Sequence, residues 1–243
     1  MKRLFVISLT LIASMIVSLV AINPAAANND KARVFVQFAN GRMANVQNAL
    51  NAAGAEFHYT FDDLNTFAVS LPVQALAGLE RNPNVVLIEE DSPRYPVGVI
   101  PNPGLESQNL FFSSGGQVIP YGVDMVQARD VWDADRNGAV DSGAPTGANR
   151  KVCIIDSGYY TGHEDLPNSP SQVSGYNGNL AWDQDGDGHG THVAGTIVAM
   201  NNALGVIGVT PGTVQIYVVR VFGNDGVWAY SSTLLHAAQR CRD

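Results

Sequence analysis

Two apolar runs separated by a helical stretch constrain the fold of this chain more than any other feature. The run "KVCIIDSG" at 151–158 ends in aspartate and glycine, and "VQIYVVRVF" at 214–222 is equally apolar. Between them, "GTHVAGTIVAM" at 190–200 has the small and apolar residues of a closely packed helix. This order predicts an α/β fold with a buried parallel sheet and helices on both faces. Active groups of such sheets gather at the carboxyl ends of strands, where Asp156 falls.

A second pattern predicts a small separate domain at residues 28–95. Its order is β-α-β-β-α-β, which indicates a two-layer, ferredoxin-like α+β domain. Residues 96–116 are rich in proline, glycine and serine and are expected to form a linker to the α/β part at 117–243. The expected strands are 32–38, 55–61, 66–71 and 84–90, and the expected helices are 43–54 and 72–82.

The N-terminus predicts export. Lys2 and Arg3 precede an apolar run at 4–22, and three alanines at 25–27 provide an A-x-A site, so residues 1–27 are interpreted as a signal peptide. An uncleaved membrane anchor is the alternative, because the run is long enough to span a bilayer. We expect a secreted protein, extracellular or periplasmic, with no membrane contact after signal removal.

Net charge and cysteine content limit the possible partners of the chain and the possible states of its cysteines. The formal net charge is −8, which disfavours nucleic acid as a partner. The two cysteines, Cys153 and Cys241, permit one disulfide in an exported protein, and two free buried thiols are the alternative.

The stretch "DQDGDGHGTH" at 183–192 raises the question of a metal site. His189 and His192 are three residues apart and no other histidine or cysteine cluster completes a tetrahedral set, which argues against zinc. The aspartates at 183–187 match the first half of an EF-hand, but position twelve is Ala194 in place of the required glutamate. The similar loop at 133–141 also lacks that glutamate, so we keep it only as a hypothesis for a weak calcium site.

Proton transfer explains the same stretch better. A histidine that begins a helix after glycines presents its ring to a cleft, and a carboxylate at a strand end can hold one ring nitrogen. Asp156 and His189 are the candidates.

At this point the motifs resemble the subtilisin-like serine proteases, or subtilases. "VCIIDSG" at 152–158 resembles their aspartate strand, and "HGTHVAGTIVA" at 189–199 resembles their histidine motif. "IPYGVDMVQA" at 119–128 and "VVRVFGNDGVWAYSS" at 218–232 extend the match, and residues 66–91 resemble the family's inhibitory propeptide.

This resemblance implies a secreted serine endopeptidase acting on a peptide or protein substrate, with its propeptide bound to the catalytic domain. It implies that Asp156 is the triad aspartate, that His189 is the general base and that His192 is structural. It also implies a substrate-binding edge and a structural Ca²⁺ site. The edge residues are Gly226, Val227 and Trp228; the calcium ligands are the side chains of Gln117, Asp165 and Asn202 and the backbone carbonyls of Met200, Leu204 and Val206.

The pattern departs from the family in one respect. After His189 the only serines are Ser231 and Ser232, and neither lies in a Gly-Thr-Ser type of turn. We therefore expect these residues to be the N-terminal portion of a protease and to be inactive alone. The alternatives are a non-catalytic protease inhibitor or folding chaperone acting through residues 28–95, and a calcium-dependent structural module.

Overall fold

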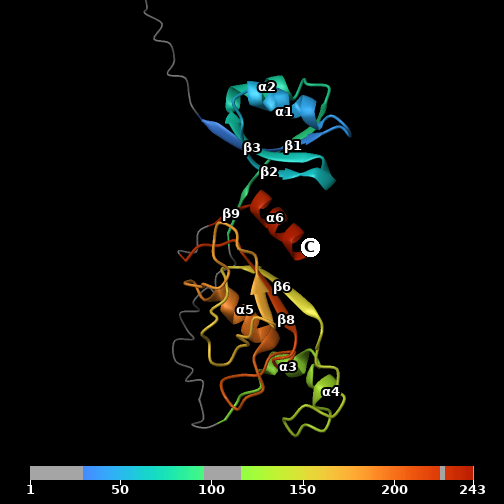
Figure 1. Cartoon of the computed structure of the whole chain (residues 1–243), viewed down its shortest axis with the longest axis vertical. Coiled ribbons are helices and arrows are strands. Elements are labelled where there is room, and N and C mark those ends of the chain that lie inside the picture. The colour runs from blue at the N-terminus through green and yellow to red at the C-terminus, as the bar shows by residue number, and fades with distance from the viewer. Residues whose placement is uncertain (1–29, 96–115, 225–227, 243) are drawn as a thin grey trace, which may run out of the picture. The chain divides into compact units, whose positions relative to one another are not determined.

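The computed structural model describes residues 30–95, 116–224 and 228–242 of the chain (Figure 1). The expected signal peptide at 1–27 and nearly all of the expected linker at 96–116 lie outside the described residues. The described residues from Lys31 onward belong to one compact unit. In the part that the structure describes, no helix has the length and apolar character needed to span a membrane.

The first elements form a four-stranded antiparallel sheet with two helices. The strand order is β2-β3-β1-β4, and β1 pairs with both β3 and β4. A 3-10 turn, η1, at Asp62–Leu64 connects β2 to β3. The bounds are β1 Lys31–Phe38, α1 Met43–Ala52, β2 Glu56–Phe61, β3 Thr66–Pro72, α2 Val73–Leu79 and β4 Val85–Glu90.

Period-two alternation in β1 decides which face of this strand is covered. Val34, Val36 and Phe38 of β1 point to one face and are buried, while the residues between them are only half-buried. Val46 and Leu50 of α1 pack against that face, and α1 and α2 lie on the same side of the sheet (Figure 1). Each element expected from the sequence in 31–90 is present, with ends shifted by at most three residues.

The later elements form a three-stranded parallel sheet in the order β6-β8-β7. The expected parallel sheet is therefore confirmed. The sequence patterns did not predict β7, β9 or the short helices α3 and α4. The bounds are α3 Tyr121–Met125, α4 Arg129–Trp132, β6 Lys151–Asp156, β7 Val173–Gly175, α5 His189–Val198, β8 Gln215–Arg220, β9 Ala229–Tyr230 and α6 Ser231–Arg242.

Both faces of this sheet are covered, which explains its continuous apolar strands. Ile154 and Ile216 face α5, where Ala194 and Val198 complete a buried cluster. The opposite face packs against α6 through a second cluster that contains Ala237.

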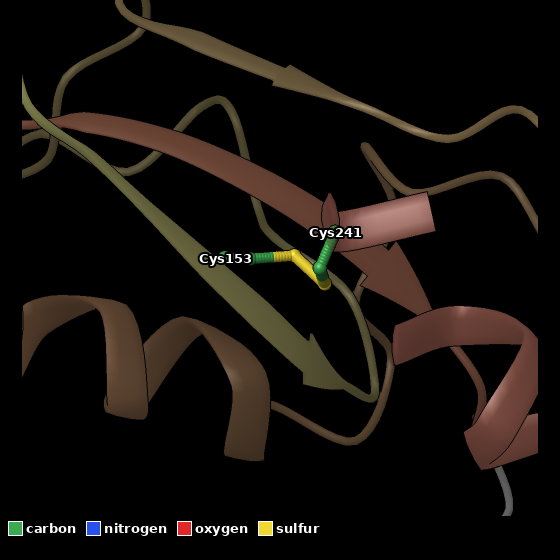
Figure 2. Close-up of a disulfide and its surroundings, with 2 residues drawn as sticks. All are labelled: Cys153 and Cys241. Atoms are coloured by element: carbon green, nitrogen blue, oxygen red, sulfur yellow. A yellow bond between two sulfur atoms is a disulfide. The ribbon is translucent and has the colours of Figure 1, made fainter. Parts of the chain in front are cut away.

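A disulfide joins the second face to α6. Cys153 of β6 and Cys241 of α6 are bonded, with Cα atoms 5.7 Å apart (Figure 2). This spacing is ordinary for a disulfide. Of the two states that the sequence left open, the structure has the disulfide.

The helix α6 also contacts the first sheet. Asp91, directly after β4, accepts hydrogen bonds from Ser232 N at 2.8 Å and from Ser232 Oγ at 2.5 Å. Arg33 Nε of β1 lies 2.8 Å from Asp91 Oδ2. In addition, β5 at Pro93–Arg94 pairs antiparallel with β9.

Candidate active site

Asp156 is the last residue of β6, at the carboxyl end of the parallel sheet. Its backbone oxygen accepts a hydrogen bond from Val221 N at 2.8 Å, beyond the end of β8, which fixes the strand end. The side chain is 11% exposed, and its Oδ1 accepts a hydrogen bond from Ser157 N at 2.7 Å. The carboxylate is thus held in one orientation at the edge where α/β sheets place their reactive groups.

His189 is the first residue of α5 and follows Gly188, whose φ is +91°. The next residue, Gly190, explains why the helix begins so close to β6. A Cβ atom at Gly190 would lie 2.2 Å from the backbone oxygen of Gly158, so only glycine permits this approach.

The two side chains meet. His189 Nδ1 lies 2.7 Å from Asp156 Oδ1, and the imidazole is 26% exposed. A carboxylate at Nδ1 holds the imidazole in the tautomer that leaves Nε2, on the far side of the ring, to exchange a proton. This arrangement suits general acid–base chemistry. His192 lies one turn further along α5, where its backbone N–H bonds to Gly188 O and its side chain is exposed.

The residues expected to bind calcium gather at one place. Gln117 Nε2 contacts the carbonyl oxygen of Met200, that of Val206 at 2.8 Å and Asn202 Oδ1 at 3.4 Å. Asp165 is 4% exposed; its Oδ2 accepts a hydrogen bond from Val206 N at 2.8 Å, whereas its buried Oδ1 has no hydrogen-bond partner among the described residues.

An oxygen cluster with one orphaned carboxylate oxygen is the chemistry that a hard cation requires. Burial raises the pKa of Asp165, and hydrogen bonds from Val206 and Asn202 only partly oppose this effect. These residues therefore fit Ca²⁺. Leu204 lies in the same loop, where its backbone N–H bonds to Asn202 Oδ1 at 2.9 Å. Among the described residues, no group of three or more histidine, cysteine, aspartate or glutamate side chains could hold a metal ion. A calcium site here would instead draw on backbone carbonyls and on the side chains of Gln117, Asp165 and Asn202.

The acidic loop at 133–141 has a different explanation. Asp133 is fully buried and its Oδ2 accepts hydrogen bonds from Arg129 Nε at 2.9 Å and Nη2 at 2.6 Å. Burial by itself raises the pKa of Asp133, but hydrogen bonds from Arg129 and Gly138 outweigh burial and lower it. The carboxylate is charged and already neutralised by Arg129, so the structure gives no support to a calcium ion there.

The expected substrate edge is only partly described. Gly226 and Val227 lie outside the described residues. The ring of Trp228 lies edge-on to Tyr230, with centroids 4.5 Å apart. Trp228, Tyr230 and Tyr95 line a cavity of about 730 Å³.

Comparison with known proteins identifies the segment around this site. Residues 147–237, which contain Asp156 and His189, match the sequence model of the Subtilase family. Over residues 147–237 the chain is therefore similar to the subtilases.

The chain as a whole is also similar to subtilisins. It is 30% identical to subtilisin J of Geobacillus stearothermophilus over 92% of this chain and 52% of that protein. It is 40% identical to the subtilisin of Bacillus pumilus over 47% of this chain and 38% of that protein. The resemblance inferred from the motifs is thereby confirmed. The chain spans about half the length of the curated relatives it matches.

The fold is likewise subtilisin-like. Fervidolysin from Fervidobacterium pennivorans, a keratinolytic enzyme related to subtilisin, superposes with a TM-score of 0.58. The match covers 86% of this chain and 33% of that chain at 20% identity, and it supports the fold alone.

Sequence reasoning missed two features around this site. Asp185 was considered only as a calcium ligand, yet its carboxylate contacts the first turn of α5. Its place in a glycine-rich loop just before a helix is the sequence signal that could have found it. The contact of Asp91 with Ser232 joins residues 141 positions apart, and no local sequence pattern predicts such a pair.

Proposed function

We propose that this chain supplies the general base and its orienting carboxylate to a subtilisin-type serine endopeptidase. The observation that carries the proposal is the 2.7 Å contact between His189 Nδ1 and Asp156 Oδ1. Peptide hydrolysis would proceed by acyl transfer. A serine hydroxyl attacks the substrate carbonyl, His189 Nε2 takes the hydroxyl proton and returns it to the leaving amine, and Asp156 stabilises the imidazolium. Water, deprotonated by the same nitrogen, then attacks the acyl-serine and releases the acid product and the serine hydroxyl.

The nucleophile is not proposed among these 243 residues. Ser232 is fully buried and its hydroxyl bonds to Asp91, while the hydroxyl of Ser231 bonds to the backbone oxygen of Ser92 at 3.0 Å. Neither hydroxyl is free to attack a peptide. We expect the chain alone to show no peptidase activity.

We assign residues 28–95 to a ferredoxin-like inhibitory propeptide, with a signal peptide at 1–27, a linker at 96–116 and the catalytic portion at 117–243. The antiparallel order β2-β3-β1-β4 with two helices on one face supports the fold assignment. The pairing of β5 with β9 supports inhibition, because the chain after the small domain lies along Ala229–Tyr230, the strand that directly follows Trp228. Peptides bind sheet edges in the same way, with Gly226, Val227 and Trp228 as the proposed substrate edge.

Export and calcium complete the proposal. The disulfide between Cys153 and Cys241 supports an oxidising, extracellular or periplasmic compartment. Ca²⁺ would be held by Gln117, Asp165 and the loop at 200–206, where it would satisfy the orphaned Oδ1 of Asp165 and stabilise the loop. Titration calorimetry with Ca²⁺ should give binding that Asp165→Asn abolishes, whereas Asp135→Asn, at an exposed position of the loop at 133–141, should leave the affinity unchanged.

A second candidate function is an inhibitor or folding chaperone. The same contact of Asp91 with the first turn of α6 favours it, because a free small domain could dock on the equivalent helix of another protease. Adding the whole chain to an active subtilisin tests this possibility: dose-dependent inhibition that Asp91→Ala weakens would support it.

A chimera tests the catalytic assignment. Residues 117–243 would replace the matching segment of subtilisin J, and casein hydrolysis would be measured. The chimera should be active, and His189→Ala should lower kcat by roughly 10⁶-fold. His192→Ala, the same change three residues along α5, is the matched control and should stay active. A folded chimera in which both variants hydrolyse casein equally would refute the role of His189.

A further inference from the structure

The carboxylate of Asp185 is the most heavily bonded side chain in the loop before α5. Its Oδ1 accepts hydrogen bonds from Ser157 Oγ at 2.9 Å and from Gly188 N at 2.8 Å. Its Oδ2 accepts hydrogen bonds from Thr191 N at 2.8 Å and from Thr191 Oγ1 at 2.5 Å. One side chain thus joins the turn after β6 to the beginning of α5.

The beginning of α5 depends on such outside acceptors. Gly188, at the N-cap position, has no side chain to cap the helix, so its first N–H groups need other partners. His189 N bonds to Asp187 Oδ1 at 3.3 Å, Gly190 N bonds to Ser157 Oγ at 2.9 Å, and Thr191 N bonds to Asp185.

Ser157 carries the connection to the other member of the catalytic pair. It is 1% exposed and follows Asp156 directly, and its own N–H holds Asp156 Oδ1 at 2.7 Å. Its hydroxyl donates to Asp185 and accepts from Gly190 N. Ser157 and Asp185 therefore hold both the carboxylate of Asp156 and the first turn of α5 in place.

We propose that Asp185 is a positioning residue that fixes the orientation of His189 against Asp156. This inference rests on the proposed function, because it concerns the same pair of side chains. Asp185 takes no proton and contacts no substrate in this role. It holds the turn after β6 and the start of α5 at one separation, so that the imidazole meets the carboxylate with its Nδ1.

The charge state of Asp185 suits this role. Burial raises the pKa of Asp185, but hydrogen bonds from Thr191, Gly188 and Ser157 outweigh burial, and the net effect is a lowered pKa. The side chain is thus an anion at neutral pH. It can accept four hydrogen bonds at once, and a negative charge beside the first turn of a helix is favourable.

Nuclear magnetic resonance of the whole chain, labelled with ¹⁵N-histidine, tests the proposal. The proton on His189 Nδ1 should give a downfield resonance that exchanges slowly with water. Asp185→Asn keeps one acceptor oxygen but turns a donor toward Thr191, so exchange of this proton should accelerate roughly tenfold. Asp183→Asn, the same change at an exposed position of the same loop, is the matched control and should leave the resonance unchanged.

A second variant keeps the result interpretable if Asp185→Asn does not fold. Ser157→Ala leaves the bonds of Asp185 to α5 in place and removes the bridge from Asp185 toward Asp156 together with the acceptor of Gly190 N–H, so it should accelerate exchange of the same proton. Absence of the resonance from the unmodified chain would overturn the His189–Asp156 pairing and with it the proposed function. A resonance that is present and insensitive to Asp185→Asn or Ser157→Ala would overturn only the role of Asp185.

Discussion

Replacing Asp91 by asparagine should loosen the contact between α6 and the first sheet. The side chain of Asp91 is fully buried, and it lies 2.8 Å from Arg33 Nε, whose side chain is 18% exposed. Breaking a buried ion pair by removing one partner costs about 3–5 kcal/mol. Because Arg33 retains some contact with solvent and asparagine keeps one acceptor for Ser232 N–H, we expect the lower end, about 3 kcal/mol.

Urea unfolding followed by tryptophan fluorescence is a suitable assay. All three tryptophans lie after residue 117, and Trp228 contacts Tyr230, over whose ring the Arg33 guanidinium lies at 3.6 Å. The emission should therefore respond to loss of this contact. With a slope of about 2 kcal/mol per molar urea, a loss of about 3 kcal/mol lowers the midpoint by roughly 1.5 M.

Asp63→Asn is the matched control. Asp63 also pairs with α6, through Arg242 Nη1 at 2.8 Å, but both side chains are largely exposed, at 45% and 63%. Exposed ion pairs contribute little to stability, so this midpoint should hardly move. Equal shifts for the two variants would refute the reasoning, because they would show that burial of Asp91 does not set the strength of the contact.

Three further outcomes follow from the packing. Gly190→Ala should destabilise the chain by about 3 kcal/mol, because the new Cβ would overlap the backbone oxygen of Gly158. At Gly195 a new Cβ would have no neighbour closer than 4.0 Å, so Gly195→Ala should stabilise the chain by up to about 1 kcal/mol. Thermal melts would compare the two variants. Cys241→Ser removes a crosslink over 88 residues and should lower the free energy of unfolding by about 2–5 kcal/mol. A urea midpoint equal to that of the unmodified chain with its disulfide intact would contradict this prediction. Burial, followed by the charge of Arg240, lowers the pKa of His236 below 6.5, so the unfolded chain binds more protons than the folded chain. The contribution of His236 to stability should be full above pH 6.5 and decline below it. His236→Asn should flatten that decline in pH-dependent thermal melts.

The sequence determined the secondary structure where period and composition are strong. The alternation at 32–38 and the continuous apolar runs at 151–156 and 215–220 decide which strands have one buried face and which have two. These signals are local, because each residue's burial is set by the period of its own element. Short elements such as β7 and β9 carry too few residues to show a period, and they were missed for that reason.

The pairings between distant residues were decided only by the tertiary structure. The motifs predicted that Asp156 and His189 are partners, yet their contact depends on the close approach of Gly190 to Gly158. The order of residues in the sequence does not reveal this distance. Three other features also depend on tertiary contacts between distant residues. They are the disulfide in place of two thiols, the ion pair of Asp133 with Arg129 and the four hydrogen bonds of Asp185. Residue type tells what a side chain can bind, whereas the folded chain determines which partner lies within bonding distance.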